Sequence, residues 1–166
     1  MGQDFTDAIA LLKADHRTVE DLFEQFENAR GKDSKQEIAE QICTELKIHA
    51  MIEEEIFYPA LRGKIDDDLL DEAYVEHDGA KVLINDITAG GADEDFYDAK
   101  VTVLSEEIEH HVGEEEKPGE GMFAQARDAD VDLVDLRDRM AARKEELMAL
   151  AESEGLPPAQ LSAVAM

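Results

Sequence analysis

The stretch ELKIHAMIEEEIFYPAL, residues 45–61, places His49 and Glu53 four positions apart. An α-helix completes a turn in about 3.6 residues, so side chains at positions i and i+4 lie on one face and can bind one centre. The stretch EEIEHHVGEEE, residues 106–116, repeats this spacing with His111 and Glu115. The repeated spacing predicts two helices that each present an imidazole and a carboxylate on the same side.

Two further histidines stand alone on predicted helices. His16 lies in DHRTVEDLFEQFE, residues 15–27, and His77 lies in YVEHDGAKVLI, residues 74–84. Each of the four predicted helices carries an apolar stripe, which the histidine or the His-Glu pair interrupts at one level. The stripes include Ile9, Leu12, Val19, Ile38, Ile42, Leu46, Leu70, Ile84, Ile87, Val101, Leu104 and Ile108. We therefore expect four imidazoles and two carboxylates to meet inside a helical bundle.

Carboxylates inside an apolar bundle predict a bound cation. Burying an ionised carboxylate without a partner is costly, and metal ions would compensate the charges of Glu53 and Glu115. One histidine on a helix stripe is more often a hydrogen-bonded core residue, but four at one level with two aligned carboxylates favour metal binding. The predicted ligands of two transition-metal ions are His16, His49, Glu53, His77, His111 and Glu115.

The fourth predicted helix offers two pairs at this spacing, His111 with Glu115 and His110 with Glu114. Counting back along the helix from His111 gives the apolar residues Ile108, Leu104 and Val101, whereas counting back from His110 gives the mostly polar set Glu107, Glu106 and Val103. The first pair is therefore preferred, and His110 is predicted to be exposed or to neighbour the site. The second pair stays open as an alternative.

The hydrophobic periodicity predicts an all-α fold. Helices are expected over about residues 4–28, 34–63, 66–89 and 93–116, and a fifth over about 130–154. Ser34 and Glu37 suggest a capping box at the second helix, and Pro59 is expected to kink that helix or end it early. Long helices with short turns favour an up-down-up-down four-helix bundle. The predicted organisation is a bundle over residues 1–126, an accessory helix over 127–154 beside it or extending outward, and a flexible tail over 155–166.

The formal net charge of −26 on 166 residues is strongly acidic. It argues against DNA, RNA and anionic membranes as partners, because each would repel such a surface, and it identifies no protein partner. The single cysteine, Cys43, cannot form an internal disulfide. No apolar run approaches the ~20 residues of a membrane span, and the N-terminus is acidic where a signal peptide is basic. The sequence therefore predicts a soluble, cytoplasmic protein.

The donor types limit the choice of metal. Imidazole suits Zn, Cu, Fe and Ni, while paired carboxylates in a bundle core favour two iron or manganese ions. A ferritin-like site would need Glu-x-x-His on two helices, and only Glu107 with His110 has that spacing here, off the apolar stripe. A ferritin-like site is therefore disfavoured, and the donor types leave two iron or two manganese ions open, with zinc possible.

The order His, H-x-x-x-E, His, H-x-x-x-E in the four quoted stretches resembles the hemerythrin-like family of HHE cation-binding domains, over about residues 4–126. The resemblance implies a four-helix bundle around an oxo- or hydroxo-bridged di-iron centre. It implies Glu53 and Glu115 as bridging ligands, and as terminal ligands His16, His49, His77 and His111. Two features depart from the family: Ala73 stands where oxygen-carrying members have a fifth histidine, and KPGEG at 117–121 looks like a short insertion.

Four histidines leave coordination positions open to an exogenous ligand. The first functional hypothesis is therefore a non-haem di-iron protein that binds and transforms a small oxidant, either O2, peroxide or nitric oxide. The alternative is an oxygen- or iron-sensing module, or reversible O2 binding without catalysis. Whether the protein is an enzyme stays undecided at this stage.

Four neighbours of the predicted ligands receive weaker interpretations. Glu54 either reaches the site or faces solvent, with solvent favoured, and Tyr58 is expected to pack at the rim of the site. Tyr74, one turn before His77, either lines the pocket or packs. Cys43 is expected to be buried and inert.

Overall fold

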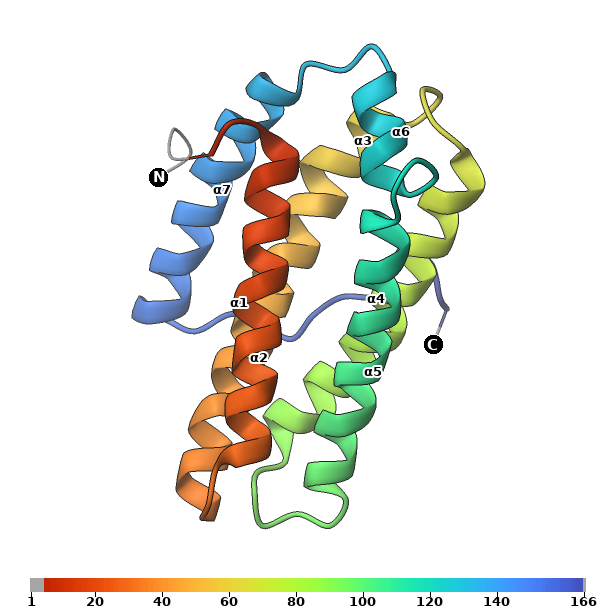
Figure 1. Ribbon diagram of the computed structural model, residues 1–166. Coiled ribbons are helices and arrows are strands. Elements are labelled where there is room, and N and C mark those ends of the chain that lie inside the picture. The colour runs from red at the N-terminus through yellow and green to blue at the C-terminus, as the bar shows by residue number, and fades with distance from the viewer. Residues whose placement is uncertain (1–4, 166) are drawn as a thin grey trace.

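Four long helices form an up-down-up-down bundle in the computed structural model of the chain, which describes residues 5–165 (Figure 1). They are α1 (Ala8–Asn28), α2 (Lys32–Ile52), α4 (Asp67–Ala89) and α5 (Tyr97–Glu116). α2 continues into the π-helical segment η2 (Glu53–Phe57) and the short α3 (Tyr58–Leu61). Every regular element among the described residues is a helix, so the predicted all-α bundle is confirmed.

Two helices follow the bundle in the sequence. α6 (Met122–Asp128) lies across the predicted boundary at residue 126, and its helical conformation was not predicted. α7 (Leu133–Ser153) is the expected fifth helix and packs alongside α1 and α2 (Figure 1). None of the helices in residues 5–165 is both long enough and apolar enough to cross a membrane.

The helix starts differ from the predicted ones in three places. The capping box of Ser34 and Glu37 is wrong, because α2 begins at Lys32 and its N-cap is Gly31, which has φ 93°. Glycine tolerates positive φ, so the chain turns into the helix earlier than Ser34. The predicted start at Asp4 lies outside the described residues, and α1 begins at Ala8. α5 begins at Tyr97 instead of near residue 93.

Pro59 marks a real irregularity in the second long helix. Proline has no backbone N–H and clashes with the carbonyl four residues before it, so a regular α-helix cannot pass through it undisturbed. The chain accommodates the proline with the π-helical turn of Glu53–Phe57, which ends two residues before it. The helix then continues to Leu61, so the expected early end is not observed and the irregularity is a π-helical turn.

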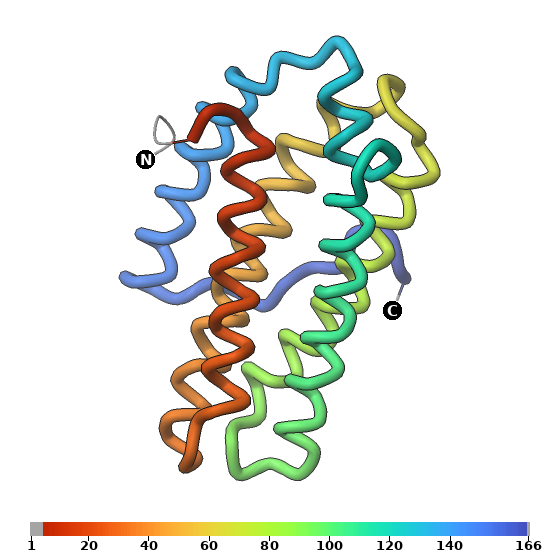
Figure 2. Tube along the Cα trace, in the orientation of Figure 1, coloured from red at the N-terminus to blue at the C-terminus, as the bar shows by residue number. Residues whose placement is uncertain are grey.

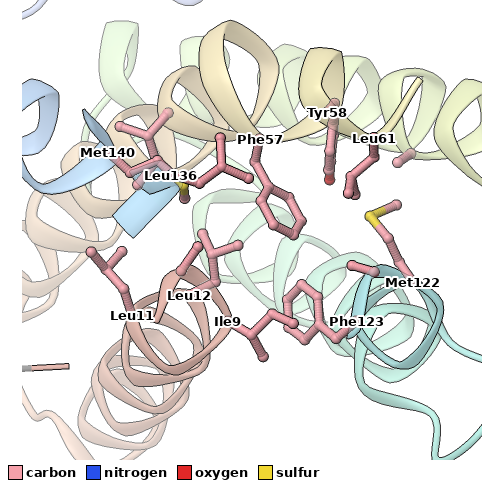
Figure 3. Close-up of a cluster of buried hydrophobic side chains, with 14 of the residues drawn as sticks. Ile9, Leu11, Leu12, Phe57, Tyr58, Leu61, Met122, Phe123, Leu136 and Met140 are labelled. Atoms are coloured by element: carbon pink, nitrogen blue, oxygen red, sulfur yellow. The ribbon is translucent and has the colours of Figure 1, made fainter. Parts of the chain in front are cut away.

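The apolar core consists of two clusters at opposite ends of the bundle. One cluster joins α1, α2, η2, α3, α4, α6 and α7, and Figure 3 shows Phe57, Phe123, Leu12, Leu136 and Met140 within it. The other joins α1, α2, α4 and α5 and comprises Val19, Leu22, Phe23, Phe26, Ala39, Ile42, Cys43, Leu46, Ala80, Ile84, Ile87, Tyr97, Val101 and Leu104. The buried histidines and glutamates belong to neither cluster. They form a polar layer in the core.

The C-terminal segment after α7 crosses the bundle and reaches α4 (Figure 2). The sequence predicts a flexible tail over residues 155–166, of which Met166 lies outside the described residues. In the structure, Asn85 Nδ2 donates to the Ala159 carbonyl at 2.9 Å and Asn85 Oδ1 accepts from the Ala159 N–H at 2.8 Å. The buried carboxylate of Asp78 accepts from the backbone N–H groups of Ser162, Ala163 and Val164. These contacts hold the tail against α4.

Candidate metal centre

The six predicted ligands meet in the polar layer between the two apolar clusters. His16 comes from α1, His49 and Glu53 from the second long helix, His77 from α4, and His111 and Glu115 from α5. All six are buried: Glu53 is 0% exposed and Glu115 is 1% exposed, and none of the histidines exceeds 7%. The i, i+4 spacing therefore places both His-Glu pairs on the inner face, as expected from the helical period.

The donor atoms fall into two groups, and each group is compact enough to hold one metal ion. Atoms of His16, His49, Glu53 and Glu115 lie within 4.8 Å of one another. Atoms of Glu53, His77 and His111 form the second group by the same criterion. Glu53 belongs to both groups.

Each carboxylate lies between one imidazole of the first group and one of the second. Glu53 Oε1 is 3.3 Å from His49 Nε2 and 3.1 Å from His77 Nε2. Glu115 Oε1 is 3.1 Å from His16 Nε2, while its Oε2 is 3.3 Å from His111 Nε2. Both glutamates therefore span the two groups.

A carboxylate contacts the outer nitrogen of every one of the four imidazoles. His49 Nδ1 lies 3.0 Å from Asp15, and His77 Nδ1 lies 2.7 Å from Glu54. The other two pairs are His16 Nδ1 with Glu116 at 2.5 Å and His111 Nδ1 with Glu76 at 2.7 Å. A carboxylate on Nδ1 fixes the proton there and leaves the Nε2 lone pair free to bind a metal. The predicted solvent exposure of Glu54 is therefore wrong.

These outer carboxylates are themselves paired with cationic side chains or with histidine. Asp15 binds Lys144 of α7, Glu116 binds Arg17, and Glu54 binds Lys81. Glu76 lies 3.3 Å from His110 Nε2. The fifth helix thus takes part in the site, because Lys144 compensates the charge of the carboxylate that orients His49.

The outer carboxylates follow a repeat that relates α1–α2 to α4–α5. Within each helix pair, the acid that directly precedes the histidine of the first helix contacts the histidine of the second helix. Asp15 of α1 thus contacts His49 of α2, and Glu76 of α4 contacts His111 of α5. The acid that directly follows the buried glutamate, Glu53 or Glu115, contacts the first histidine of the other helix pair. Glu54 thus contacts His77, and Glu116 contacts His16. The motif acid-His followed by His-x-x-x-Glu-Glu occurs twice, and this signal in the sequence was overlooked.

Tyr58 breaks the symmetry between the two groups. Its hydroxyl donates to Glu115 Oε2 at 2.8 Å and lies 3.1 Å from Glu53 Oε1. It also lies 3.2 Å from Nε2 of both His77 and His111. The predicted rim position of Tyr58 is therefore wrong. The π-helical turn explains the error, because it brings the side chain five residues after Glu53 back to the inner face.

The alternative pair of the fourth helix lies outside the cluster. His110 is 65% exposed and contacts Glu114 at 3.0 Å and Glu76 at 3.3 Å. These three residues form a group of possible donors in which His110 is exposed and the two glutamates are partly buried. The structure thus places the pair His111 and Glu115 among the buried donors. The pair His110 and Glu114 lies outside the buried cluster.

The electrostatics of the buried layer show how strongly it requires positive charge. Burial alone would lower the pKa of His49 and His111, but the charges of Glu53 and Glu115 raise both well above the usual value for imidazole. Burial opposes ionisation of Glu53, yet the surrounding imidazoles hold its pKa well below the usual range. Without metal, the buried carboxylates therefore favour the protonated forms of His49 and His111.

Four buried polar atoms have no hydrogen-bond partner among the described residues: Nε2 of His16, Nε2 of His49, Oε2 of Glu53 and Oε1 of Glu115. All four residues belong to the first donor group. His16 Nε2 and Glu115 Oε1 are only 3.1 Å apart, but their mutual geometry is not that of a hydrogen bond. Buried polar atoms are normally satisfied, so converging lone pairs of this kind fit a metal cation.

Comparison with known proteins places this site in a family. Residues 7–118 match the family model described as the Hemerythrin HHE cation binding domain. A DNA nickase from Nostoc sp. is 29% identical over 106 residues, which cover 64% of this chain and 30% of that protein. The chain thus spans less than a third of the length of this relative.

The fold has a counterpart among solved structures. A hemerythrin HHE cation-binding domain-containing protein from Mycobacterium kansasii superimposes with a TM-score of 0.73 at 21% identity. The match covers 92% of this chain and 96% of that one. Because the family model spans more than half of the chain and coincides with the helices that carry the His/Glu cluster, the chain belongs to the hemerythrin HHE cation-binding domain family.

Proposed function

We propose that the protein holds two iron ions at its His/Glu cluster and uses them to bind and transform a small oxidant, either O2, peroxide or nitric oxide. The observation that carries the proposal is the position of Glu53 and Glu115, each of which spans the two donor groups. Carboxylates between two sets of imidazoles suit a pair of iron or manganese ions better than a single zinc ion. The ligands would be His16, His49, Glu53, His77, His111 and Glu115.

The ions would supply the redox chemistry, and the chain would supply geometry and protons. The four carboxylates on Nδ1 hold the imidazole rings in one orientation. The apolar clusters enclose the layer on both sides along the bundle axis. Burial and the neighbouring charges of Glu115 and Glu53 raise the pKa of Tyr58 well above its usual value, so this hydroxyl keeps its proton near the centre.

A second candidate function is sensing or reversible binding of O2 without catalysis. The same ligands would serve it, and the difference lies in whether the bound oxidant is consumed. The DNA-nicking activity in the name of the Nostoc relative is not proposed for this chain. The chain covers only 30% of that protein, and its formal charge of −26 would repel DNA.

Metal analysis of anaerobically purified protein, followed by optical titration with O2 and hydrogen peroxide, tests the proposal. We expect two irons per chain and an absorption band that disappears as peroxide is consumed. Two irons with a stable band after O2 would favour the sensing or carrier function. Fewer than two metal ions per chain after reconstitution with iron, manganese and zinc in turn would contradict the two-metal site.

Replacing Tyr58 with phenylalanine should separate metal binding from reactivity. The six ligands stay in place, so metal content should be unchanged. The rate of peroxide consumption should fall about 100-fold, the usual scale for losing a positioned proton donor. Stopped-flow measurement of peroxide loss on variants with equal iron content gives the comparison.

Tyr74→Phe is the matched control for this variant. Tyr74 lines the cavity beside the centre and its ring stands edge-on to Tyr58, with 5.3 Å between ring centroids. Its hydroxyl has no hydrogen bond to any of the six ligands among the described residues. We expect its removal to change the rate less than about twofold. Equal rates for Tyr58→Phe and wild type would limit Tyr58 to a structural role.

A further inference from the structure

A cavity of about 510 Å³ lies beside the metal centre, between α2, α4 and the C-terminal tail. The imidazoles of His16, His49, His77 and His111 line it. Pockets for small organic molecules typically measure about 300–1,000 Å³. One water molecule takes up about 30 Å³ in the liquid, and O2 or peroxide needs little more. The cavity is therefore much larger than a small oxidant requires.

The walls of this cavity are mainly apolar. They come from α1, α2, α4, α5 and the tail, and they include Val19, Leu46, Ala80, Ile84, Ile108 and Leu156. Apolar walls with a few polar groups at one end are typical of sites for organic ligands. Here the polar end is the histidine layer of the metal centre.

The other charged side chains on the walls already have partners within the chain. Lys47 Nζ donates to the Pro157 carbonyl at 3.1 Å, and Lys81 Nζ lies 3.0 Å from Glu54. The remaining two, Asp15 and Glu55, are paired with Lys144 and Arg143. A ligand charge at Lys81, Asp15 or Glu55 would have to break an ion pair, and an anion at Lys47 would compete with the Pro157 carbonyl for the ammonium group, whereas a neutral ligand disturbs none of these contacts.

The tail provides the outer wall. Pro157, Pro158 and Ala159 line the cavity, and the paired hydrogen bonds between Asn85 and Ala159 fix this segment on α4. Two consecutive prolines restrict the backbone, so the wall is preformed. Ser162 at the end of the segment contacts Glu54, the carboxylate that orients His77. The tail therefore joins the cavity wall to the metal centre.

We propose that this cavity binds one neutral, mainly apolar organic molecule, which would lie between the tail and the histidine layer. This ligand would reach the same metal centre, so any reaction of the ligand there rests on the proposed function. The binding step itself depends on the cavity alone. It can be measured with or without metal.

Titration with N-phenyl-1-naphthylamine, a neutral dye that fluoresces in apolar surroundings, tests the proposal. The chain has no tryptophan, so the protein contributes little background. We expect saturable binding of one dye per chain. Ala50 lines the cavity, and Ala50→Phe should weaken binding at least about tenfold by filling it. Ala142 is exposed on α7, so Ala142→Phe should bind as wild type does.

Asn85→Ala provides a second variant that leaves the cavity walls unchanged in sequence. It removes both hydrogen bonds to Ala159, so we expect a loosened tail and dye binding at least about fivefold weaker. The anionic analogue 1-anilinonaphthalene-8-sulfonate should bind at least about tenfold more weakly than the neutral dye. Wild-type affinity in both Ala50→Phe and Asn85→Ala, or tighter binding of the anion, would overturn the proposal.

Metal content measured on the same samples keeps the two proposals apart. Dye binding that persists in protein unable to take up metal would support the cavity and contradict the di-iron function. Metal uptake without saturable dye binding would leave the metal centre standing and remove the organic ligand. Both measurements use the full chain.

Discussion

Glu53→Ala should abolish the stabilisation that metal gives to this protein. Glu53 is 0% exposed and is the one residue common to both donor groups, so its loss removes a ligand from each ion. A ligand present at about 1,000 times its Kd stabilises the folded state by about 4 kcal/mol. For a chain of this size that corresponds to about 10 °C in Tm. We expect this difference between metal-loaded and chelator-treated protein in the wild type, and almost none in the variant.

The comparison within each variant isolates the metal from other effects of the substitution. Glu53→Ala also changes the chain without metal, because it leaves protonated imidazoles without their buried counter-charge. Subtracting the Tm of the chelator-treated sample removes that contribution. Metal content by elemental analysis should fall in parallel with the lost stabilisation.

Glu55→Ala is the matched control on the same helical turn. Glu55 has a side chain that is 42% exposed and pairs with Arg143 on α7. Removing an exposed ion pair changes the free energy of unfolding by less than about 1 kcal/mol. Metal-dependent stabilisation should therefore equal that of the wild type. Full metal content in Glu53→Ala would show that Glu53 is not a ligand.

The site residues that could be predicted are those whose relative positions are set by the spacing within a single helix. The pairs His49 with Glu53 and His111 with Glu115 follow from the i, i+4 spacing alone, and the structure brings both to the inner face. The carboxylates on Nδ1 act between helices, so no spacing within one helix reveals them. Only the twofold repetition of the whole pattern could have indicated Asp15, Glu54, Glu76 and Glu116 as a set.

The position of Tyr58 could not be predicted from regular helix periodicity, because the helix is irregular just before it. In a regular α-helix a residue five positions after Glu53 points away from it, so the rim position was the natural expectation. The π-helical turn adds a residue to the turn and restores the alignment. Pro59 signals a disturbance in the sequence, but it does not say whether the helix ends, kinks or bulges.

The contacts of the tail could not be predicted because composition describes local tendency only. Two prolines and several small residues after Gly155 are typical of a loosely held terminus. The contacts that hold this segment come from Asp78, Lys81 and Asn85, which lie more than 70 positions earlier. Packing against a distant helix leaves no periodic trace in the tail itself.

Replacing each of the two adjacent histidines of α5 in turn should give opposite results. His111 is buried, its Nε2 lies 3.3 Å from Glu115, and it belongs to the second donor group. His111→Ala should therefore lose about half of the bound metal or more, and Glu115 and Glu76 would each lose a partner. The expected loss of metal-dependent stabilisation approaches that of Glu53→Ala.

His110→Ala should be nearly silent in the same assays. Its side chain is 65% exposed and its two contacts are surface carboxylates, so the change in the free energy of unfolding should stay within about 0.5 kcal/mol. Metal content should match the wild type, because His110 reaches the centre only through Glu76 and His111. Metal loss in His110→Ala with retention in His111→Ala would instead assign the fourth-helix ligands to His110 and Glu114. That result would require α5 to rotate about its axis when metal binds, because in the structure the apolar stripe of Val101 and Leu104 holds His111 inside.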